Sequence, residues 1–261
     1  NNTHQKISNN MSELENRIAI ITGSSTGIGA GVAEAFADEG ATVIINYPDE
    51  SELQNAQNVL KKIIKLSPQS QIIQANVSKE NEVISMINEI NSNHGTIDIL
   101  VNNAGIATSA LVHEMTSNMW DELISIHLKG TFLCTREVLK IMYKRNYGKI
   151  INTASQLAYK GSAGFSHYTA AKGAILSFTR SLSLEIGNKN IRANCVAPGA
   201  TETRMLADVP MEILNDIKSG IPKGKIAKVS EIVPSYVFLA SEAANHFVGQ
   251  CLSPNGGDVF L

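Results

Sequence analysis

Short apolar runs alternate with longer, helix-like stretches along most of the chain. The short runs are rich in Ile and Val, as strands are, and occur at Arg17–Thr22, Thr42–Asn46, Gln71–Ala75, Ile97–Val101, Lys149–Thr153, Ile191–Val196 and Gln250–Leu252. The stretches between them are typical of helices and lie at Ile28–Glu39, Glu52–Leu66, Glu80–Asn91, Asn118–Lys144, Tyr168–Ile186 and Ser230–Ser241.

This alternation predicts repeated strand–helix–strand units. Strands that are apolar at nearly every position are expected where both faces of a parallel sheet are covered. Because such crossovers are right-handed, the units build an open sheet with helices on both sides. We therefore predict an α/β fold, a Rossmann-like doubly wound parallel sheet that forms a single domain over residues 12–261. The one long irregular stretch, Pro198–Pro222, is predicted to be a lid over a site.

Residues 1–11 are polar apart from Ile7 and Met11, and no apolar signal-peptide segment follows them. We expect a flexible tail, with Met11 as a native start, and a cytoplasmic protein. The three cysteines are far apart with no CxxC pair, and the six histidines have no metal-binding spacing. Neither a disulfide framework nor a metal site is therefore predicted.

Composition narrows the classes of partner. The chain has 261 residues, 43% of them hydrophobic and 18% charged, which is ordinary for a globular protein. Its net charge of −2 provides no basic surplus for nucleic acid. No apolar run approaches the roughly 20 residues that a membrane span requires. A small-molecule partner is therefore expected, rather than nucleic acid or membrane.

A glycine-rich turn, Thr22–Gly29 (TGSSTGIG), joins the first predicted strand to the first predicted helix. Glycines let a backbone turn sharply beside a pyrophosphate, and a helix N-terminus offers free N–H groups to an anion. The turn therefore predicts dinucleotide binding, although a tight turn without a ligand remains the alternative. The expected phosphate-binding residues are Gly23, Ser25, Thr26, Gly27, Ile28 and Gly29.

The end of the second strand bears on which dinucleotide is bound. An acid there would bind the adenosine ribose and repel a 2′-phosphate. This strand ends in Asn46-Tyr47-Pro48, and the first acid, Asp49, comes only after the turn. No arginine is present either, but Ser24, Ser25 and Asn46 could donate hydrogen bonds to a phosphate. The leading cofactor is therefore NADP, with NAD as the alternative.

A second group of residues points to proton transfer. Tyr168 and Lys172 are four positions apart, so they share one face of a helix. A nearby ammonium group lowers the pKa of a phenol and makes it a usable general acid or base. Ser155 lies just beyond the fifth strand, at the sheet edge where open α/β sheets bind ligands. Its hydroxyl could hold a substrate oxygen that Tyr168 protonates.

Together these motifs resemble the short-chain dehydrogenase/reductase family over Arg17–Leu261. The resemblance is carried by Thr22–Gly29, Asn102–Gly105, Ser155, Tyr168 with Lys172, and Pro198-Gly199, in that order. It implies a Rossmann-like fold and a nicotinamide cofactor. It also implies that Tyr168 transfers the proton, that Ser155 orients the substrate, and that Lys172 binds the nicotinamide ribose.

The resemblance also implies cofactor contacts and an assembly. The adenosine side would be lined by Asn102, Ala104 and Gly105, and the nicotinamide side by Pro198, Gly199, Thr201 and Thr203. Family members are commonly tetramers, with the last strand and the C-terminal tail at a subunit contact. The apolar ending Val259–Leu261 fits a homotetramer, because a monomer would expose it.

Three positions depart from the family pattern, and one of them is Pro48, at the end of the second strand, where NADP-preferring relatives often carry Arg. His127 stands where an Asn usually holds a water in a proton relay to the lysine. A histidine can hold a water and titrate, so we expect an altered relay in which His127 takes part, with simple packing as the alternative. Asn76, followed by Val77, stands where an Asp commonly binds adenine.

These observations predict an NAD(P)-dependent oxidoreductase that interconverts a ketone and a secondary alcohol. The pattern is similar to 3-oxoacyl-acyl-carrier-protein reductases and to ketone- and sugar-acting relatives, and an acyl thioester is the leading substrate. No charged cluster suited to a sugar acid occurs in Ala200–Pro222. The alternatives are a non-catalytic dinucleotide-binding sensor and a sugar or polyol dehydrogenase. An epimerase would usually be longer.

Overall fold

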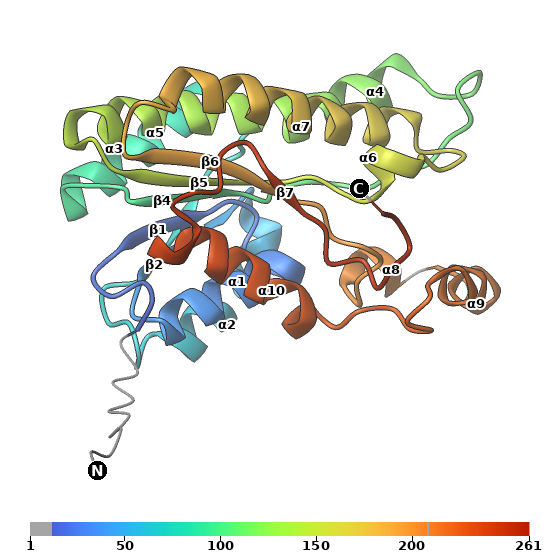
Figure 1. Cartoon of the computed structure of the whole chain (residues 1–261), viewed down its shortest axis with the longest axis horizontal. Coiled ribbons are helices and arrows are strands. Elements are labelled where there is room, and N and C mark those ends of the chain that lie inside the picture. The colour runs from blue at the N-terminus through green and yellow to red at the C-terminus, as the bar shows by residue number, and fades with distance from the viewer. Residues whose placement is uncertain (1–11, 208, 261) are drawn as a thin grey trace, which may run out of the picture.

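A seven-stranded sheet forms the centre of the protein, in a computed structural model that describes residues 12–207 and 209–260 (Figure 1). The strand order is β3-β2-β1-β4-β5-β6-β7, and every neighbouring pair is parallel. The strands are β1 (Ile18–Ile21), β2 (Thr42–Tyr47), β3 (Gln71–Gln74), β4 (Ile99–Asn102), β5 (Gly148–Thr153), β6 (Ile191–Val196) and β7 (Cys251–Leu252). The predicted strands are therefore all present, while the predicted tail at 1–11 lies outside the described residues.

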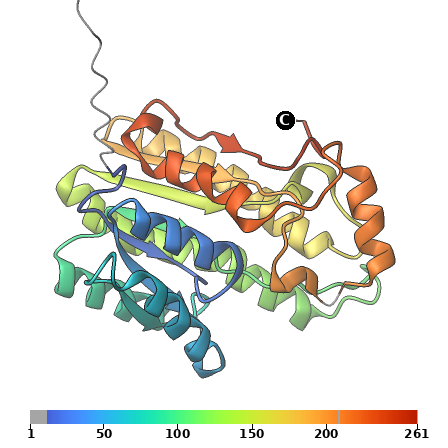
Figure 2. The same cartoon turned by 90° about the horizontal axis from the view of Figure 1, so that it is seen from below.

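Helices cover both faces of this sheet, which confirms the predicted Rossmann-like class (Figure 1). One face carries α1 (Gly27–Asp38), α2 (Leu53–Ile63) and α10 (Val229–Ala240), and α1 and α10 lie side by side in Figure 2. The other face carries α3 (Glu80–His94), α5 (Gly130–Arg145) and α7 (Ser166–Ile186). The strands are continuously apolar because alternate side chains enter two cores. Ile20 packs under one layer of helices, and its neighbour Ile21 packs under the other.

Two regions differ from the predicted elements. Residues 118–144 form α4 (Ser117–Ile124) and α5, separated by a π-helical turn at Ser125–Lys129. The prediction of an irregular stretch at Pro198–Pro222 is wrong in part, because it contains α8 (Arg204–Ala207) and α9 (Met211–Gly220). Neither helix has a fully buried residue. Neither therefore packs on the core, and a helix that packs on the core is the kind that a periodic apolar face predicts. A short α6 (Leu157–Lys160) follows β5.

A buried polar network ties the sheet to α7 just below its carboxyl edge. The Asn102 amide donates to Asn152 Oδ1 (2.8 Å), and the Asn152 amide donates to Thr179 Oγ1 (2.8 Å). All three residues are at least 95% buried. Groups this deep destabilise the fold when a partner is lost, because water cannot replace the missing hydrogen bond.

We expect Asn152→Ala to lower the free energy of unfolding by about 2–4 kcal/mol, since it leaves a buried Asn102 donor unpaired. Urea unfolding at fixed protein concentration measures this. The control Asn58→Ala changes an exposed asparagine of α2 and should stay within about 0.5 kcal/mol. Equal effects of the two substitutions would contradict a stabilising role for the network.

Candidate active site

The glycine-rich turn after β1 has a backbone that only glycine fits. Gly23 has φ +60°, and a Cβ there would lie 2.7 Å from Ala104 Cα. A Cβ on Gly29 would lie 2.5 Å from the Gly23 carbonyl oxygen. These close approaches exclude side chains at Gly23 and Gly29. The backbone of the turn is therefore not covered by side chains at these two positions, and a ligand can approach it closely.

Helix α1 begins directly at this turn, and its first N–H groups are left without side-chain partners. Thr26 is the N-cap residue, but its side chain makes no capping hydrogen bond, and the first turn contains no acidic residue. Unpaired N–H groups at the positive end of a helix suit a bound anion. The residues present therefore fit a dinucleotide pyrophosphate, as the sequence predicts.

The segment after β4 is fastened to the glycine turn. The Asn103 side-chain amide donates to the carbonyl oxygens of Thr22 (3.1 Å) and Gly23 (3.0 Å), and the Ala104 N–H donates to Thr22 Oγ1 (3.1 Å). Asn102, a predicted cofactor contact, instead turns its amide into the core network. Asn103 is thus a site residue that we did not single out, although it belongs to the motif.

The donors behind the NADP preference are all bonded within the protein. Ser24 Oγ donates to the Ile21 carbonyl (2.7 Å), and the Asn46 amide donates to the Ala75 carbonyl (2.9 Å). Ser25 Oγ donates to Glu52 Oε2 (2.9 Å). These three side chains are therefore not free to donate the hydrogen bonds to a 2′-phosphate that the sequence analysis expects. Asn46 serves the turn itself, because its Oδ1 accepts the Gly23 N–H (3.1 Å).

Asn76 and Val77 follow β3, where the resemblance places adenine. Asn76 Oδ1 accepts from the backbone and side chain of Ser78, in a tight turn before α3. Val77 is buried against α5, where a Cβ on Gly130 would lie 2.7 Å from its Cγ2. Their contact with adenine stays a prediction.

The segment after β6 forms the opposite wall of the site. The Gly199 N–H donates to the Pro254 carbonyl (3.1 Å), and Thr201 Oγ1 donates to the Gly199 carbonyl (2.9 Å). Thr203 reaches the glycine turn, since a Cβ on Gly27 would lie 3.5 Å from its Cγ2. The wall and the turn therefore approach each other at the carboxyl edge of the sheet.

Ser155, Tyr168 and Lys172 come together at the same edge. Ser155 follows β5, and the other two lie in the first turns of α7. Lys172 is buried, and its Nζ donates to the carbonyl of Thr153 (2.6 Å), the last residue of β5. The same Nζ lies 5.7 Å from the centre of the Tyr168 ring. Pro198 joins this group, because its carbonyl accepts the N–H that follows Ser155 in the chain (3.1 Å).

Burial controls the protonation of this group. It lowers the pKa of Lys172 to about 7. It also raises the pKa of the Tyr168 phenol, an effect that the Ser155 hydroxyl partly opposes. The direction of the Tyr168 pKa shift is therefore opposite to the one that the sequence analysis expects from a neighbouring ammonium group, because burial is its largest cause. The phenol is therefore held in its protonated form, which is the form that donates a proton.

His127 lies in the π-helical turn, fully buried against Tyr168, with the ring centres 5.4 Å apart. Its Nε2 lies 2.9 Å from the Ile106 N–H nitrogen and 2.8 Å from the Ile106 carbonyl oxygen. Gly105 packs on the ring, where a Cβ would lie 2.4 Å from Cε1. Burial, with the charge of Lys172 adding to it, lowers the pKa of His127 to about 3. The ring is therefore neutral near pH 7, and the expected titration of His127 is not supported.

Among residues 12–207 and 209–260, no cluster of three His, Cys, Asp or Glu residues could hold a metal ion. None of the helices described is long and apolar enough to cross a membrane. A glycine turn and a Ser–Tyr–Lys group at the carboxyl edge of one doubly wound sheet define a nicotinamide-dependent dehydrogenase or reductase.

Known proteins agree with this class. A family model described as "Enoyl-(Acyl carrier protein) reductase" matches residues 23–258. The 3-oxoacyl-[acyl-carrier-protein] reductase of Chlamydia muridarum is 36% identical over 244 residues, which are 94% of this chain and 98% of that protein. The reductases of the same name from Thermotoga maritima and Staphylococcus epidermidis are 34% and 35% identical, over 94% and 93% of this chain and 98% of each protein.

The chain therefore belongs to the short-chain dehydrogenase/reductase family, as the sequence resemblance indicated. It is an NAD(P)-dependent oxidoreductase that acts on CH–OH and C=O groups. The alternative of a non-catalytic sensor is not favoured, because the similar proteins are named as reductases.

We expect kcat/KM for ketone reduction to fall as the pH rises through about 7, because Lys172 loses its proton there while Tyr168 stays protonated. A pH–rate profile from pH 5.5 to 9 measures this. The arginine of Lys172→Arg stays charged over that range. The variant can have a lower kcat/KM than the wild type, but its kcat/KM should no longer fall as the pH rises through 7. A wild-type profile that is flat across pH 7 would contradict the protonation assigned to Lys172.

Proposed function

We propose that this protein reduces the ketone of a 3-oxoacyl thioester to a secondary alcohol, using a reduced nicotinamide cofactor. The proposal rests on the convergence of Ser155, Tyr168 and Lys172 opposite the glycine turn. The named activity of the similar reductases supports the choice of substrate.

Ser155, Tyr168 and Lys172 have different roles in the proposed reduction. Ser155 holds the ketone oxygen through its hydroxyl and polarises the carbonyl. The cofactor supplies a hydride to the carbonyl carbon when it is bound. Tyr168 donates its phenolic proton to the oxygen, which becomes the alcohol. Lys172 stands behind the phenol, where its positive charge stabilises the phenolate left by that transfer, and its remaining N–H bonds are available to the nicotinamide ribose.

His127 is proposed to support the proton path as a neutral residue. Its Nδ1 is buried and has no partner among the described residues, so it can hold a water near Tyr168. The contacts of its Nε2 with Ile106 fix the ring orientation. The cofactor contacts that the sequence analysis predicts are proposed for the glycine turn and for Asn76, Val77, Ala104, Gly105, Pro198, Gly199, Thr201 and Thr203. The side chains of Asn46 and Asn102 shape the site from within, through their hydrogen bonds to the turn and to the core.

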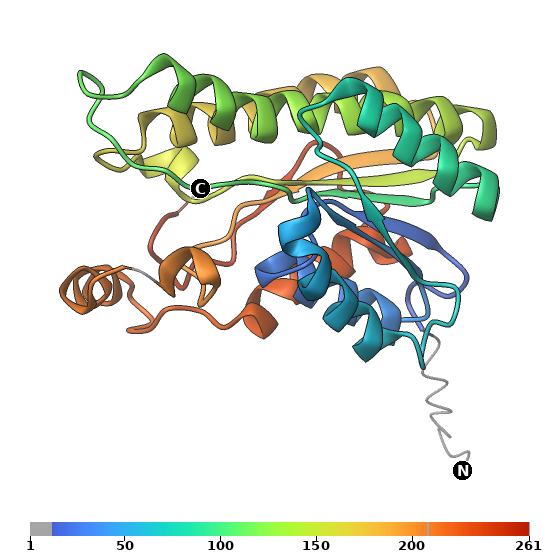
Figure 3. The ribbon, with the colours of Figure 1, turned by 180° about the vertical axis from the view of Figure 1, so that it is seen from behind.

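Apolar side chains near the site suit an acyl chain. Leu111 and Val112, after β4, are 50% and 73% exposed, and Met205, Met211 and Ile213 on α8 and α9 are 50–66% exposed. Both segments lie at the same end of the sheet, on opposite sides of it (Figure 3). Exposed apolar side chains from two segments at the same end of the sheet favour a substrate with a hydrocarbon part over a sugar or polyol.

The two forms of the cofactor have different support. The lack of an acid at the end of β2 favours NADP(H), as the sequence analysis predicts. Ser24, Ser25 and Asn46 donate to acceptors within the protein, which removes the hydrogen-bonding argument for a 2′-phosphate and leaves NAD(H) as the alternative.

We expect Tyr168→Phe to slow the reduction of an acetoacetyl thioester by about 10²–10⁴-fold, because the phenolic proton is lost while the ring is retained. Cofactor oxidation with thioesters, ketones and sugars as substrates measures this. The phenolic oxygen is not needed for the pyrophosphate site, so calorimetry should find cofactor binding nearly unchanged. Tight cofactor binding by the wild type without turnover of any carbonyl substrate would contradict the proposed reduction.

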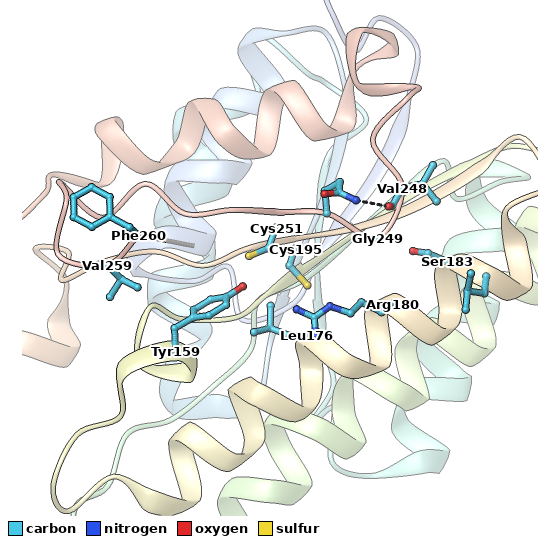
Figure 4. A pocket seen from close by; sticks show the side chains of 12 residues that line it. Tyr159, Leu176, Arg180, Ser183, Cys195, Val248, Gly249, Cys251, Val259 and Phe260 are labelled. Atoms are coloured by element: carbon cyan, nitrogen blue, oxygen red, sulfur yellow. Dashed lines mark hydrogen bonds between the residues drawn. The ribbon is translucent and has the colours of Figure 1, made fainter.

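We also propose a homotetramer in which β7 and the C-terminal tail meet a second subunit. Strand β7 pairs with β6 alone, so its outer edge is free in one chain. A pocket of about 960 Å³ opens beside it, between α7 and the tail (Figure 4). At its rim Leu184 and Phe260 are 87% and 88% exposed. Exposed apolar side chains around a free strand edge favour an interface between subunits.

Light scattering behind size-exclusion chromatography should give four times the mass of one chain. Leu184→Asp places a charge at this rim and should shift the protein to smaller assemblies. The control Leu66→Asp alters another exposed leucine, after α2 and 61% exposed, and should leave the mass unchanged. A monomeric wild type, or dissociation by the control alone, would contradict this interface.

The cytoplasmic location is likewise a proposal. Cys134, Cys195 and Cys251 are all free thiols, and the last two are paired in register on β6 and β7 without a disulfide. Unpaired thiols are typical of reducing compartments.

A further inference from the structure

The C-terminal tail after β7, residues 253–260, lies against the segment that carries Ser155. Asp258 of this tail has a side chain that is only 8% exposed. Its Oδ2 accepts from the Gln156 side-chain amide (2.7 Å), and both of its oxygens accept from Lys160 Nζ (2.7 Å each). Gln156 directly follows Ser155, and Lys160 ends α6. The carboxylate therefore joins the tail to the catalytic segment after β5.

The tail forms a closed turn that holds Asp258 in place. Asn255 is buried, its Oδ1 accepts the Gly257 N–H (2.8 Å), and its Nδ2 donates to the Val259 carbonyl (2.8 Å). Gly256 and Gly257 have φ +69° and +91°, a conformation that glycine adopts without strain. Because Asn255 bonds to the residues on either side of Asp258, the fold of the tail fixes where the carboxylate lies.

Gln156 connects this carboxylate to the wall on the nicotinamide side. Its backbone N–H donates to the Pro198 carbonyl (3.1 Å), and its buried side chain packs on Gly199, where a Cβ would lie 3.1 Å from Oε1. Asp258 also decides which way the Gln156 amide points, since only Nε2 can donate to a carboxylate. Gln156 is therefore held by the tail on one side and by the segment after β6 on the other.

The orientation of the Ser155 hydroxyl depends on the same turn of the backbone. Ser155 Oγ accepts the Leu157 N–H (3.1 Å), and the Ser155 carbonyl accepts the Ala158 N–H (3.0 Å). The hydroxyl is also hydrogen-bonded to the Tyr168 phenol. Gln156 lies inside this turn, so a shift of Gln156 would turn the hydroxyl away from the phenol. A misplacement of about 1 Å at a reacting group can slow a reaction by about 100-fold.

We propose that Asp258 is a positioning residue for Ser155. Through its hydrogen bond to Gln156, it holds the serine hydroxyl against Tyr168, so the C-terminal tail takes part in ketone reduction without contacting the substrate. This inference rests on the proposed function in one respect, which is the role of Ser155 in polarising the ketone.

Steady-state kinetics of the full chain at saturating cofactor tests this role. D258N keeps the shape of the side chain but leaves one acceptor oxygen for the two donors, Gln156 and Lys160. We expect kcat for ketone reduction to fall by about tenfold or more. Calorimetry should find the cofactor dissociation constant within about twofold of the wild type, because the Pro254 carbonyl, and not Asp258, holds the Gly199 N–H.

Two further variants isolate the contact. Q156M breaks the same link from the other side and should lower kcat to a similar extent, and it changes no residue of the tail that is proposed to meet a second subunit. The control D38N removes an exposed carboxylate at the end of α1 and should leave kcat within about twofold. An unchanged kcat in D258N and Q156M would overturn the proposal.

A double-mutant cycle with S155A separates positioning from a general structural effect. Excess enzyme makes the slow rate of S155A measurable in a single turnover. If Asp258 acts through Ser155, D258N should slow S155A by no more than about twofold, because the group that it positions is already absent. An equal slowing by D258N with and without the serine would mean a merely structural role and would also overturn the proposal.

Failure of this proposal is distinguishable from failure of the proposed function. The cycle uses whichever carbonyl substrate the wild type reduces, so it does not require a 3-oxoacyl thioester. A slow S155A beside an unaffected D258N would overturn the role of Asp258 and leave that of Ser155 intact. An S155A variant as fast as the wild type, or a wild type that reduces no carbonyl, would overturn both.

Discussion

The active site depends on the buried amine of Lys172. Its hydrogen bond to the Thr153 carbonyl fastens the start of α7 to the end of β5, two residues before Ser155. That contact places Tyr168, one helical turn earlier, beside Ser155 and His127. The burial that makes the contact specific also lowers the pKa of the amine. The same constraint therefore sets both the geometry and the protonation of the site.

The cofactor side depends on a comparable coupling between strand ends. Asn103 and Thr22 fasten the segment after β4 to the turn after β1, so the shape of the glycine turn depends on these contacts as well as on its own glycines. Parallel strands deliver these segments to one edge of the sheet, which is why residues distant in the chain meet there. Glu52 extends the same arrangement outward, since it accepts hydrogen bonds from Ser25 of the glycine turn and from Arg204 of α8.

The sequence predicted the strands and the core helices because both signals come from burial. Alternate residues such as Ile20 and Ile21 enter different cores, which leaves a continuous apolar run. The same reasoning missed α9, whose apolar residues are exposed or half-buried. The Ser–Tyr–Lys group was predictable from spacing and strand ends. The hydrogen bond between Ser25 and Glu52 was not, because a 3₁₀ turn carries Glu52 back to Ser25 from beyond the strand, and no local pattern encodes that contact.

Direct titration of Lys172 tests the account most sharply. With ¹³Cε-labelled lysine, the NMR resonance of this residue, assigned by its loss in Lys172→Met, should move with a pKa near 7. A Lys172 resonance that instead titrates at the value of a free lysine side chain, about 10.4, would mean that the amine is not buried behind Tyr168, and the site described here would be contradicted.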